Sequence, residues 1–268
     1  MPELPDVELF KRKLEACKGE RIIKAEVLLK KILSKISERE FINAVEGKRI
    51  VEIERRGKFL IAKLDSKKNI VFHFGLTGKL IVSEEKEIPK FTRIILRCKK
   101  KNIYFINKRL FGKIFVVNNP YKEIETIAKM GPEPLKLKKS EFLKMLEKHE
   151  SMNVKAFLMD QTIIAGIGNI FSDEILFQSG ILPSRKIKSL NRREREILFE
   201  KMVSVLKVAT KRAEKNYEEL MPNEAKKEIK KFIIPHRHTD QICPKCGAKL
   251  KHQKIATRTS YFCTKCQK

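Results

Sequence analysis

The fold is indicated first by the stretch IVEIERRGKFLIAKLDSKKNIVFHF, residues 50–74. It contains three short runs rich in β-branched and aromatic residues, Ile50–Ile53, Phe59–Leu64 and Ile70–Phe74. Such residues favour strands, and Gly57 supplies a turn between the first two runs. The stretch therefore predicts adjacent strands joined by short turns.

Similar runs recur on both sides of this stretch, at a spacing that is typical of an all-β sandwich or barrel. They are Ile22–Leu29, Lys79–Val82, Thr92–Leu96, Ile103–Ile106 and Lys113–Val117. Turn residues then gather at 118–120 and again at 131–134, and the second group resembles a linker. We therefore predict a β-rich N-terminal domain that ends near residue 130.

The pattern becomes helical after this linker. Ser140 is a candidate N-cap for a helix that carries Phe142 and Leu146 on one face. A longer helix is predicted from about Asn191 to Lys215, with apolar residues at helical spacing. We see no internal repeat.

Four cysteines near the end of the chain form two Cys-x-x-Cys pairs separated by sixteen residues. They are Cys243, Cys246, Cys263 and Cys266. This spacing is typical of a four-thiolate zinc site, and the strand-favouring pair Tyr261-Phe262 predicts a hairpin between the pairs. A closed four-ligand site leaves no open position for substrate, so we interpret it as one structural zinc ion rather than a catalytic or redox centre. Cys17 and Cys98 are interpreted as core residues.

The charge of the chain points to a polyanionic partner. Lys and Arg total 60 against 33 Asp and Glu, a formal net charge of +27. Nucleic acid is the favoured partner, although charge alone is also compatible with a solvated Lys-rich surface or an anionic membrane. No apolar stretch has membrane-spanning length, and the N-terminus has no signal-peptide pattern. We expect a cytoplasmic protein without membrane contact.

The N-terminal sequence carries a candidate nucleophile. Pro5 suits the first position of a helix whose apolar stripe includes Val7, Phe10 and Leu14, so Pro2 and Glu3 precede a helix N-terminus. Removal of Met1 would make Pro2 a free secondary amine. The reference pKa of an α-amine is roughly 7.7–8.0, and the positive end of the helix dipole favours the neutral nucleophile. The alternative interpretation is a frayed terminus.

Several motifs together resemble the formamidopyrimidine-DNA glycosylases, a family that includes endonuclease VIII. Besides the N-terminus and the cysteine pairs, they are Arg56-Gly57-Lys58, His73-Phe74-Gly75-Leu76-Thr77-Gly78, Arg109-Leu110-Phe111-Gly112, Met130-Gly131-Pro132-Glu133-Pro134-Leu135 and Gly166-Ile167-Gly168-Asn169. They occur in the family's order over essentially the whole chain. The resemblance implies an α+β fold: an N-terminal β-sandwich (1–130), a linker (131–139), a helix-two-turn-helix domain (140–234) and a zinc-finger hairpin (235–268).

The resemblance also implies an activity and its residues. A bifunctional glycosylase and abasic-site lyase in base excision repair would attack C1′ of a damaged nucleoside through Pro2, forming a Schiff base that leads to β,δ-elimination. Glu3 would supply a proton for opening the sugar ring. Lys58 matches the family's catalytic lysine, and Arg258 matches an arginine that grips phosphate beside the lesion. Without the resemblance, Lys58 would be interpreted as one exposed lysine among many.

Further matching residues would bind damaged double-stranded DNA. Leu76, Arg109 and Phe111 match the residues that fill the gap left by a flipped base. Asn169 would meet a phosphate at a helix N-terminus, and Lys155 matches a basic position expected to contact DNA. Taken without the family, Leu76 and Phe111 would more often be core residues. We expect a monomer that associates with the nucleoid through DNA.

The sequence departs from the family pattern at several positions. Leu110, Lys90 and Asp6 stand where an arginine, a histidine and a glutamate are usual. The segment 214–242 lacks the expected glycine-rich loop, which leaves formamidopyrimidine, 8-oxoguanine and oxidised pyrimidines all open as substrates. Two other classes stay open: a zinc-finger DNA-binding protein that has lost catalysis, and an RNA-binding zinc-ribbon protein, which would leave the N-terminal motif unexplained.

Overall fold

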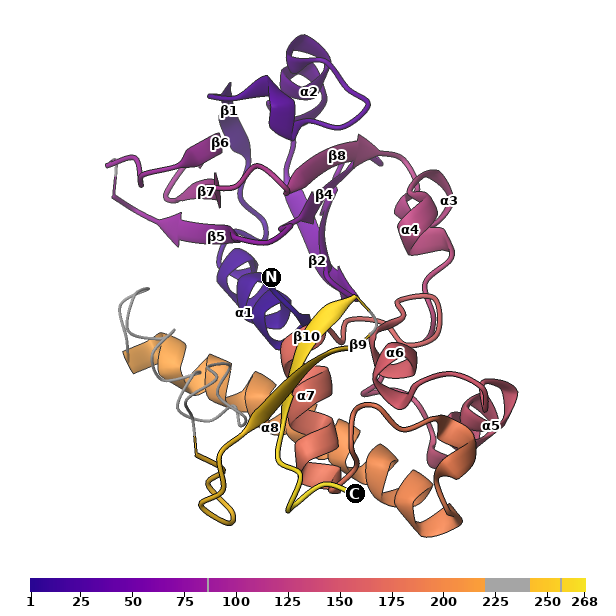
Figure 1. Ribbon diagram of the computed structural model, residues 1–268. Helices are drawn as coiled ribbons and strands as arrows, with labels where there is room; N and C mark the ends of the chain where they lie inside the picture. The colour runs from indigo at the N-terminus through magenta and orange to yellow at the C-terminus, as the bar shows by residue number, and fades with distance from the viewer. Residues whose placement is uncertain (86, 220–241, 256) are drawn as a thin grey trace. The chain divides into compact units, whose positions relative to one another are not determined.

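The computed structural model of the chain describes residues 1–85, 87–219, 242–255 and 257–268, without the side chains of 213–219. The chain, drawn in Figure 1, divides into two compact units, Met1–Lys129 and Met130–Lys268. Each unit has buried apolar residues of its own. The linker at 131–139 stays a prediction, and the predicted boundary at 234/235 lies outside the described residues.

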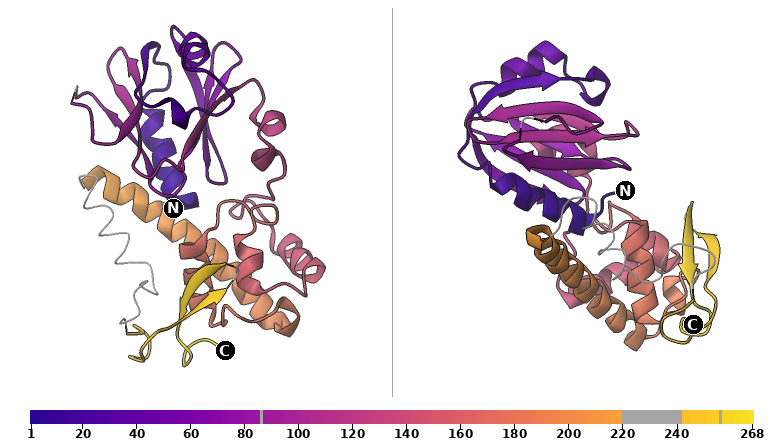
Figure 2. Two further views of the ribbon diagram at one scale, coloured as in Figure 1. Left: turned by 45° about the horizontal axis from the view of Figure 1, so that its top comes forward. Right: turned by 90° about the vertical axis from the view of Figure 1, so that its left-hand side faces the viewer.

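The first unit is built on two four-stranded antiparallel sheets (Figures 1 and 2). One sheet has the order β1-β6-β7-β5, formed by Ile22–Val27, Thr92–Cys98, Asn102–Asn107 and Gly78–Ser83. The other has the order β2-β3-β4-β8, formed by Ile50–Arg56, Phe59–Leu64, Asn69–His73 and Lys113–Val117. All eight strands predicted from the sequence are present, with ends that shift by three residues or fewer, so the predicted sandwich is confirmed.

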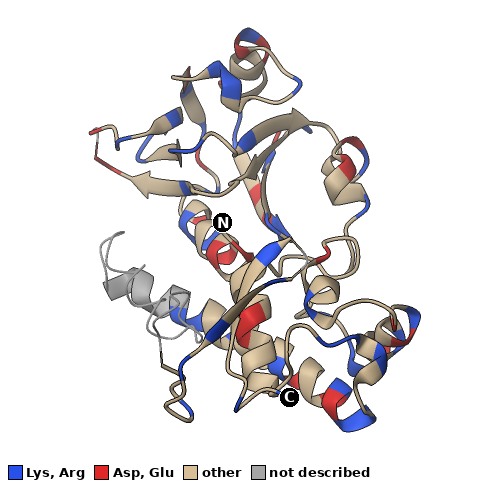
Figure 3. Cartoon of the chain, viewed as in Figure 1, with Lys and Arg blue, Asp and Glu red and all other residues tan. Residues whose placement is uncertain are grey.

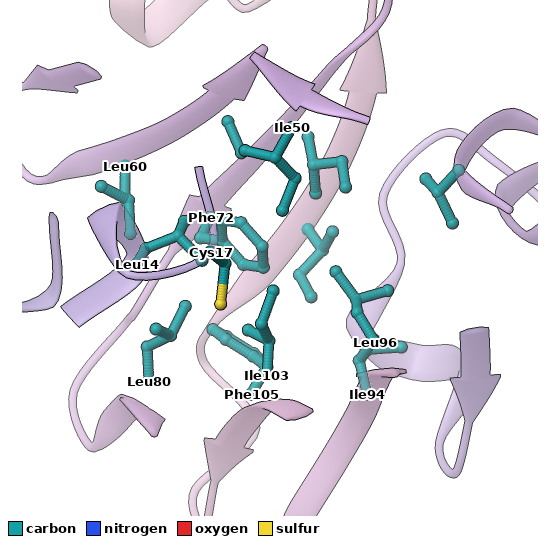
Figure 4. Packing of buried hydrophobic residues seen from close by; sticks show 14 of the residues in the cluster. Leu14, Cys17, Ile50, Leu60, Phe72, Leu80, Ile94, Leu96, Ile103 and Phe105 are labelled. Atoms are coloured by element: carbon teal, nitrogen blue, oxygen red, sulfur yellow. The ribbon is translucent and has the colours of Figure 1, made fainter. Parts of the chain in front are cut away.

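The core of this unit lies between the two sheets (Figure 4). Phe72 on β4 meets Phe105 on β7 with ring centroids 5.9 Å apart, a contact that joins one sheet to the other. Cys17 and Cys98 belong to the same core, as predicted. Burying each large apolar side chain contributes roughly 1.5–3 kcal/mol, so this apolar interior holds the two sheets together.

Helix α1 (Leu4–Glu15) packs against strands β2, β3 and β5. Its buried face includes Val7, Phe10 and Leu14, the stripe that the sequence predicts. Because this face is fixed on the sandwich, the residues that precede the helix are fixed with it. The other short helices of the unit are η1 (Lys30–Ile32), α2 (Glu38–Val45), α3 (Pro120–Glu123) and α4 (Glu125–Ala128).

The second unit is helical. Its helices are α5 (Lys139–Lys148), α6 (Val154–Met159), α7 (Asn169–Ser179), η2 (Ile187–Ser189) and α8 (Arg192–Glu219). Phe142 on α5 packs against Phe157 and Phe199, with ring centroids 5.8 and 5.4 Å apart. The predicted cap at Ser140 is wrong. The N-cap is Lys138, whose N–H donates to Glu141 at 2.8 Å, so the helix begins one residue before Ser140.

A two-stranded hairpin closes the chain. Strand β9 (Lys251–Ile255) pairs antiparallel with β10 (Arg258–Phe262), and the strand predicted at Tyr261-Phe262 is confirmed. The hairpin contacts α7 through β10. The described part of the chain contains no helix with the length and apolar character needed to cross a membrane.

Candidate active site and DNA-binding residues

Glu3 is the N-cap of helix α1. Its N–H donates to the Asp6 carboxylate at 2.8 Å, and its carbonyl accepts from Val7 at 3.1 Å. The residue is 2% exposed, so its carboxyl group is held at the helix start and shielded from bulk water. The helix begins at Leu4, which places Pro5 at the second helical position rather than the predicted first. Pro2 lies directly before this cap and is half-buried.

An ion pair connects this helix to the hairpin that carries Lys58. Arg55 on β2 donates to Glu8 of α1 at 2.7 Å and to the Gly57 carbonyl at 3.0 Å. Gly57 has a φ of 53°, which suits a tight hairpin turn where a side chain would be strained. Lys58 follows it and is only 7% exposed, unlike the exposed lysine that the sequence alone would suggest. The structure thus fixes the helix start and Lys58 to one another through β2.

His73 lies on β4 opposite Phe59, the residue that follows Lys58. Its ring centroid is 4.8 Å from that of Phe59. Burial lowers the pKa of His73 to about 4, and the charge of Lys58 acts in the same direction. The imidazole is therefore neutral at pH 7, and it offers a hydrogen-bonding group beside Lys58 without a further positive charge.

The predicted gap-filling residues lie on two loops of this unit that are packed against each other. The Arg109 N–H donates to the hydroxyl of Thr77, the residue that follows Leu76, at 3.2 Å. The Arg109 guanidinium lies over the Phe111 ring, 5.4 Å from its centroid. Phe111 is 56% exposed, which for so large an apolar side chain indicates a contact surface rather than a core position. Leu76 is half-buried.

The backbones of these two loops are packed closely against each other. A Cβ at Gly75 would lie 2.3 Å from the Phe111 carbonyl carbon, and one at Gly112 would lie 2.9 Å from the His73 carbonyl oxygen. Asn107 is fully buried between the loops and donates to the Phe74 carbonyl at 3.1 Å. The motif glycines are thus required by close backbone approach, and Asn107 is a supporting residue that the sequence reasoning missed.

In the second unit, Asn169 and Arg258 are brought together. Asn169 is the first residue of α7, as predicted, and its amide donates to the Thr259 carbonyl at 3.2 Å. Arg258 precedes Thr259 at the start of β10 and is exposed. Helix N-termini, amides and guanidinium groups all bind phosphate, so these two neighbouring segments carry groups suited to a phosphate.

Lys155, for which a DNA contact is predicted, does not lie on the surface of the protein. The residue is fully buried, and its ammonium group pairs with Asp173 of α7 at 2.5 Å. Asp173 also accepts from the Ser260 hydroxyl at 2.5 Å, so α6, α7 and β10 meet at one carboxylate. A charged side chain without solvent needs such a partner, which explains why this lysine faces inward. An acidic residue within an apolar helix, as Asp173 is, was the signal available in the sequence.

The four cysteines of the hairpin gather as predicted. All four sulfur atoms lie within 4.8 Å of one another, with Cys243 and Cys266 at 3.7 Å and Cys246 and Cys263 at 3.5 Å. A tetrahedral zinc ion with Zn–S bonds of ~2.3 Å places sulfurs about 3.8 Å apart, so the residues fit the ion.

The pKa values of the cysteine thiols in this cluster are also consistent with a bound cation. The Ala248 N–H and the neighbouring thiols lower the pKa of Cys246 to about 7, whereas hydrogen bonding to Cys246 raises the pKa of Cys266 to about 12. The thiols thus compete for the stabilisation of negative charge, and a bound metal would supply it to all four.

These elements define a class: a two-unit protein with a β-sandwich, a helix-two-turn-helix region and a cysteine-rich hairpin. Residues 1–114 match the formamidopyrimidine-DNA glycosylase N-terminal domain, residues 130–220 the formamidopyrimidine-DNA glycosylase H2TH domain, and residues 241–268 a zinc finger found in FPG and IleRS. The chain therefore belongs to the formamidopyrimidine-DNA glycosylase family of DNA-repair proteins, and the predicted resemblance and α+β fold are confirmed.

Individual relatives match over the full length. A formamidopyrimidine-DNA glycosylase from Carboxydothermus hydrogenoformans is 35% identical over 272 residues, which cover 100% of both chains. The crystal structure of wild-type Lactococcus lactis Fpg (MutM) with DNA containing N7-benzyl-Fapy-dG has a TM-score of 0.86 at 25% identity, covering 100% of both chains. A structure of MutM with DNA containing carbocyclic 8-oxo-G has a TM-score of 0.87 at 25% identity, also over 100% of both chains.

Proposed function

We propose that this protein is a bifunctional DNA glycosylase and abasic-site lyase that acts as a monomer on damaged double-stranded DNA. The observation that carries the proposal is the arrangement of the N-terminus. Pro2 precedes a buried Glu3 at the N-cap of α1, and the Glu8–Arg55 pair connects this helix to the Lys58 turn. A nucleophile, a proton donor and a cation are thus held on connected elements of one unit.

The chemistry starts with Met1 removal, which frees the Pro2 amine. The Pro2 nitrogen bonds to C1′ while the bond from C1′ to the damaged base breaks, and the base leaves with the electron pair. The nitrogen then gives up its proton and the departing base takes up a proton. Glu3 donates a proton to the ring oxygen of the sugar as the ring opens. The resulting iminium draws electrons from C2′, which loses a proton as the 3′ phosphate departs. In a second elimination C4′ loses a proton and the 5′ phosphate departs from C5′ with its bonding electrons.

The remaining residues act on the DNA. The loops that carry Leu76, Arg109 and Phe111 suit the gap that a flipped base leaves, since an exposed aromatic ring and a guanidinium can replace the lost stacking and pairing. Asn169 and Arg258 would hold a phosphate near the lesion. Lys155 acts indirectly, through its pair with Asp173 beneath β10.

One zinc ion bound by Cys243, Cys246, Cys263 and Cys266 would hold the hairpin in shape. The metal supplies structural cross-linking, and the position of Arg258 at the start of β10 depends on that shape. The preferred lesion is one of formamidopyrimidine, 8-oxoguanine or an oxidised pyrimidine. The segment 214–242, whose sequence bears on this choice, falls mostly outside the described residues.

Borohydride trapping tests the proposal. Duplex DNA with one abasic site is incubated with enzyme and sodium borohydride, and the adduct is located by peptide mass spectrometry. We expect a covalent adduct on Pro2 and none with an N-terminally acetylated preparation. A catalytically inactive DNA-binding protein would shift the duplex in a gel but form no adduct, and that result would overturn the proposal.

A further inference from the structure

Phe91 is an exposed aromatic residue outside the gap-filling loops. It lies between β5 and β6, directly after Lys90 and before the first residue of β6. Its relative exposure is 36%, and no part of the proposed chemistry requires it. Three cations surround its ring: the Lys90 and Lys108 ammonium groups each lie 5.4 Å from the ring centroid, and the Arg93 guanidinium lies at 6.0 Å.

The backbone holds this ring in a strained conformation. Phe91 has a φ of 67°, in the left-handed region that bulky residues avoid because the Cβ meets the backbone. The conformation is fixed on both sides. Thr92 donates through its N–H to the Pro89 carbonyl at 3.1 Å, and Asn107 donates to the Phe91 carbonyl at 3.0 Å. Glycine would suit this position better for folding, so the presence of a phenylalanine points to a use for its ring.

In the part of the chain that the structure describes, the three cations around the Phe91 ring have no negatively charged partner to offset their mutual repulsion. Within the described residues, none of Lys90, Arg93 and Lys108 forms an ion pair with a carboxylate. Arg93 is held in place by a hydrogen bond to the Asn107 carbonyl at 3.0 Å. Three like charges around one ring repel each other, and an anion would relieve that repulsion.

A nucleotide matches both the exposed Phe91 ring and the three cations around it. Its flat base can stack on the ring, and its phosphates can pair with the cations. The patch also adjoins the proposed DNA-binding loops in the chain, because Lys108 directly precedes Arg109. Lys and Arg are spread over the elements of this unit, among Asp and Glu residues (Figure 3). The segment between β5 and β6 that carries Phe91 also contains Glu84, Glu85 and Glu87, so the positive charge offered to a phosphate comes from the three cations that lie around the ring.

We propose that Phe91, with Lys90, Arg93 and Lys108, binds an unpaired nucleotide of a DNA strand, the base stacking on Phe91 and the phosphates pairing with the cations. A base stacked on the ring would displace the Lys90 and Lys108 ammonium groups toward the phosphates. This inference rests on the proposed DNA binding of the chain but not on its catalysis. It adds a single-stranded contact that is separate from the residues placed at the lesion.

The test compares Phe91→Gly, Phe91→Tyr and wild type for binding to a short fluorescein-labelled oligothymidylate, by fluorescence anisotropy at fixed salt. Glycine removes the ring and accepts the positive φ, so the variant should fold with an unchanged or higher Tm. We expect Phe91→Gly to weaken binding about 5- to 150-fold, the range for losing one stacked base, and Phe91→Tyr to stay near wild type. The matched control is Tyr121→Ala, which removes another exposed ring of the same unit and should leave the affinity unchanged.

Two results would overturn the inference: equal oligothymidylate affinity in Phe91→Gly and wild type, or a lower Tm in Phe91→Gly, which would show that the ring serves folding. Borohydride trapping on abasic-site duplex at saturating enzyme separates this from the proposed function. We expect Phe91→Gly to form the adduct as wild type does. If wild type forms no adduct, the proposed catalysis fails, while the stacking inference is still decided by the oligothymidylate measurement.

Discussion

At the scale of single residues, Glu3 has two roles: its backbone caps helix α1, and its carboxyl group is the proposed proton donor. Its backbone N–H is held by Asp6, which fixes the residue at the start of α1, while its carboxyl group is shielded from water. A substitution that keeps the shape of the side chain should therefore leave the cap intact and change only the proton. The role of Glu3 as proton donor can therefore be tested separately from the role of Pro2 as nucleophile.

Replacing Glu3 with Gln should reduce base excision far more than strand cleavage at a preformed abasic site. Excision needs a proton for ring opening, whereas an abasic sugar already offers an aldehyde to the Pro2 amine. Single-turnover kinetics on two matched duplexes, one with an oxidised base and one with an abasic site, measure both steps. Glu15→Gln, on the same helix, is the control. Equal losses of rate on both substrates would instead show that Glu3 supports both steps and is not specific to ring opening.

His73 gives a pH prediction. Its folded-state pKa is lowered to about 4 by burial and by Lys58, below the unfolded value near 6.5. Between these values the unfolded chain takes up a proton that the folded chain does not, so stability falls as pH drops from about 6.5 to 4, by at most about 3 kcal/mol. His73→Asn should show a smaller decrease in Tm between pH 7 and pH 5 than wild type. An identical decrease in both proteins would contradict this.

At the scale of elements, the hairpin depends on one carboxylate of α7. Asp173 meets the buried ammonium of Lys155 and the hydroxyl of Ser260, and these groups belong to α6 and β10. Buried ion pairs add little net stability, but removing one partner leaves an uncompensated charge. The pair therefore specifies where β10 lies on α7, and with it where Arg258 begins the strand.

Asp173→Asn should lower the stability of the chain by about 3–5 kcal/mol, the cost of leaving a buried charge unpaired. The double variant with Lys155→Met should recover most of this loss, because no charge remains and the introduced amide oxygen can still accept from Ser260. Thermal unfolding measures both. The exposed pair of Lys139 and Glu200, at 3.3 Å, is the control, and Glu200→Gln should cost less than about 1 kcal/mol. A double variant as unstable as the single one would show that the pair is not the cause.

At the scale of the whole molecule, regular patterns made most of the fold predictable. The eight strands, the long helix and the cysteine cluster follow from alternation, helical spacing and ligand spacing, which are properties of local sequence. Contacts between distant segments were not predictable in this way. The inward position of Lys155 depends on Asp173, eighteen residues later, and the burial of Lys58 depends on a turn tied to α1. A sequence shows that a lysine is present but not which distant carboxylate it meets.

The sandwich and the C-terminal hairpin also differ in what holds them together. The sandwich has a large apolar core and, among the described residues, no cysteine cluster, whereas the hairpin carries four thiols and a small apolar cluster around Phe177 and Leu250. Zinc binding should therefore stabilise the hairpin much more than the sandwich.

Metal removal should consequently act on the sandwich and on the hairpin unequally. Chelation should weaken DNA binding while the sandwich stays folded, because Arg258 loses its fixed position first. Hydrogen exchange followed by mass spectrometry can compare amide protection in β3 and β4 with that in β9 and β10, alongside DNA affinity. Retained affinity in a protein shown to be free of zinc would contradict a role for the metal in holding Arg258. Simultaneous loss of protection in the sandwich and the hairpin would contradict their independent stabilisation.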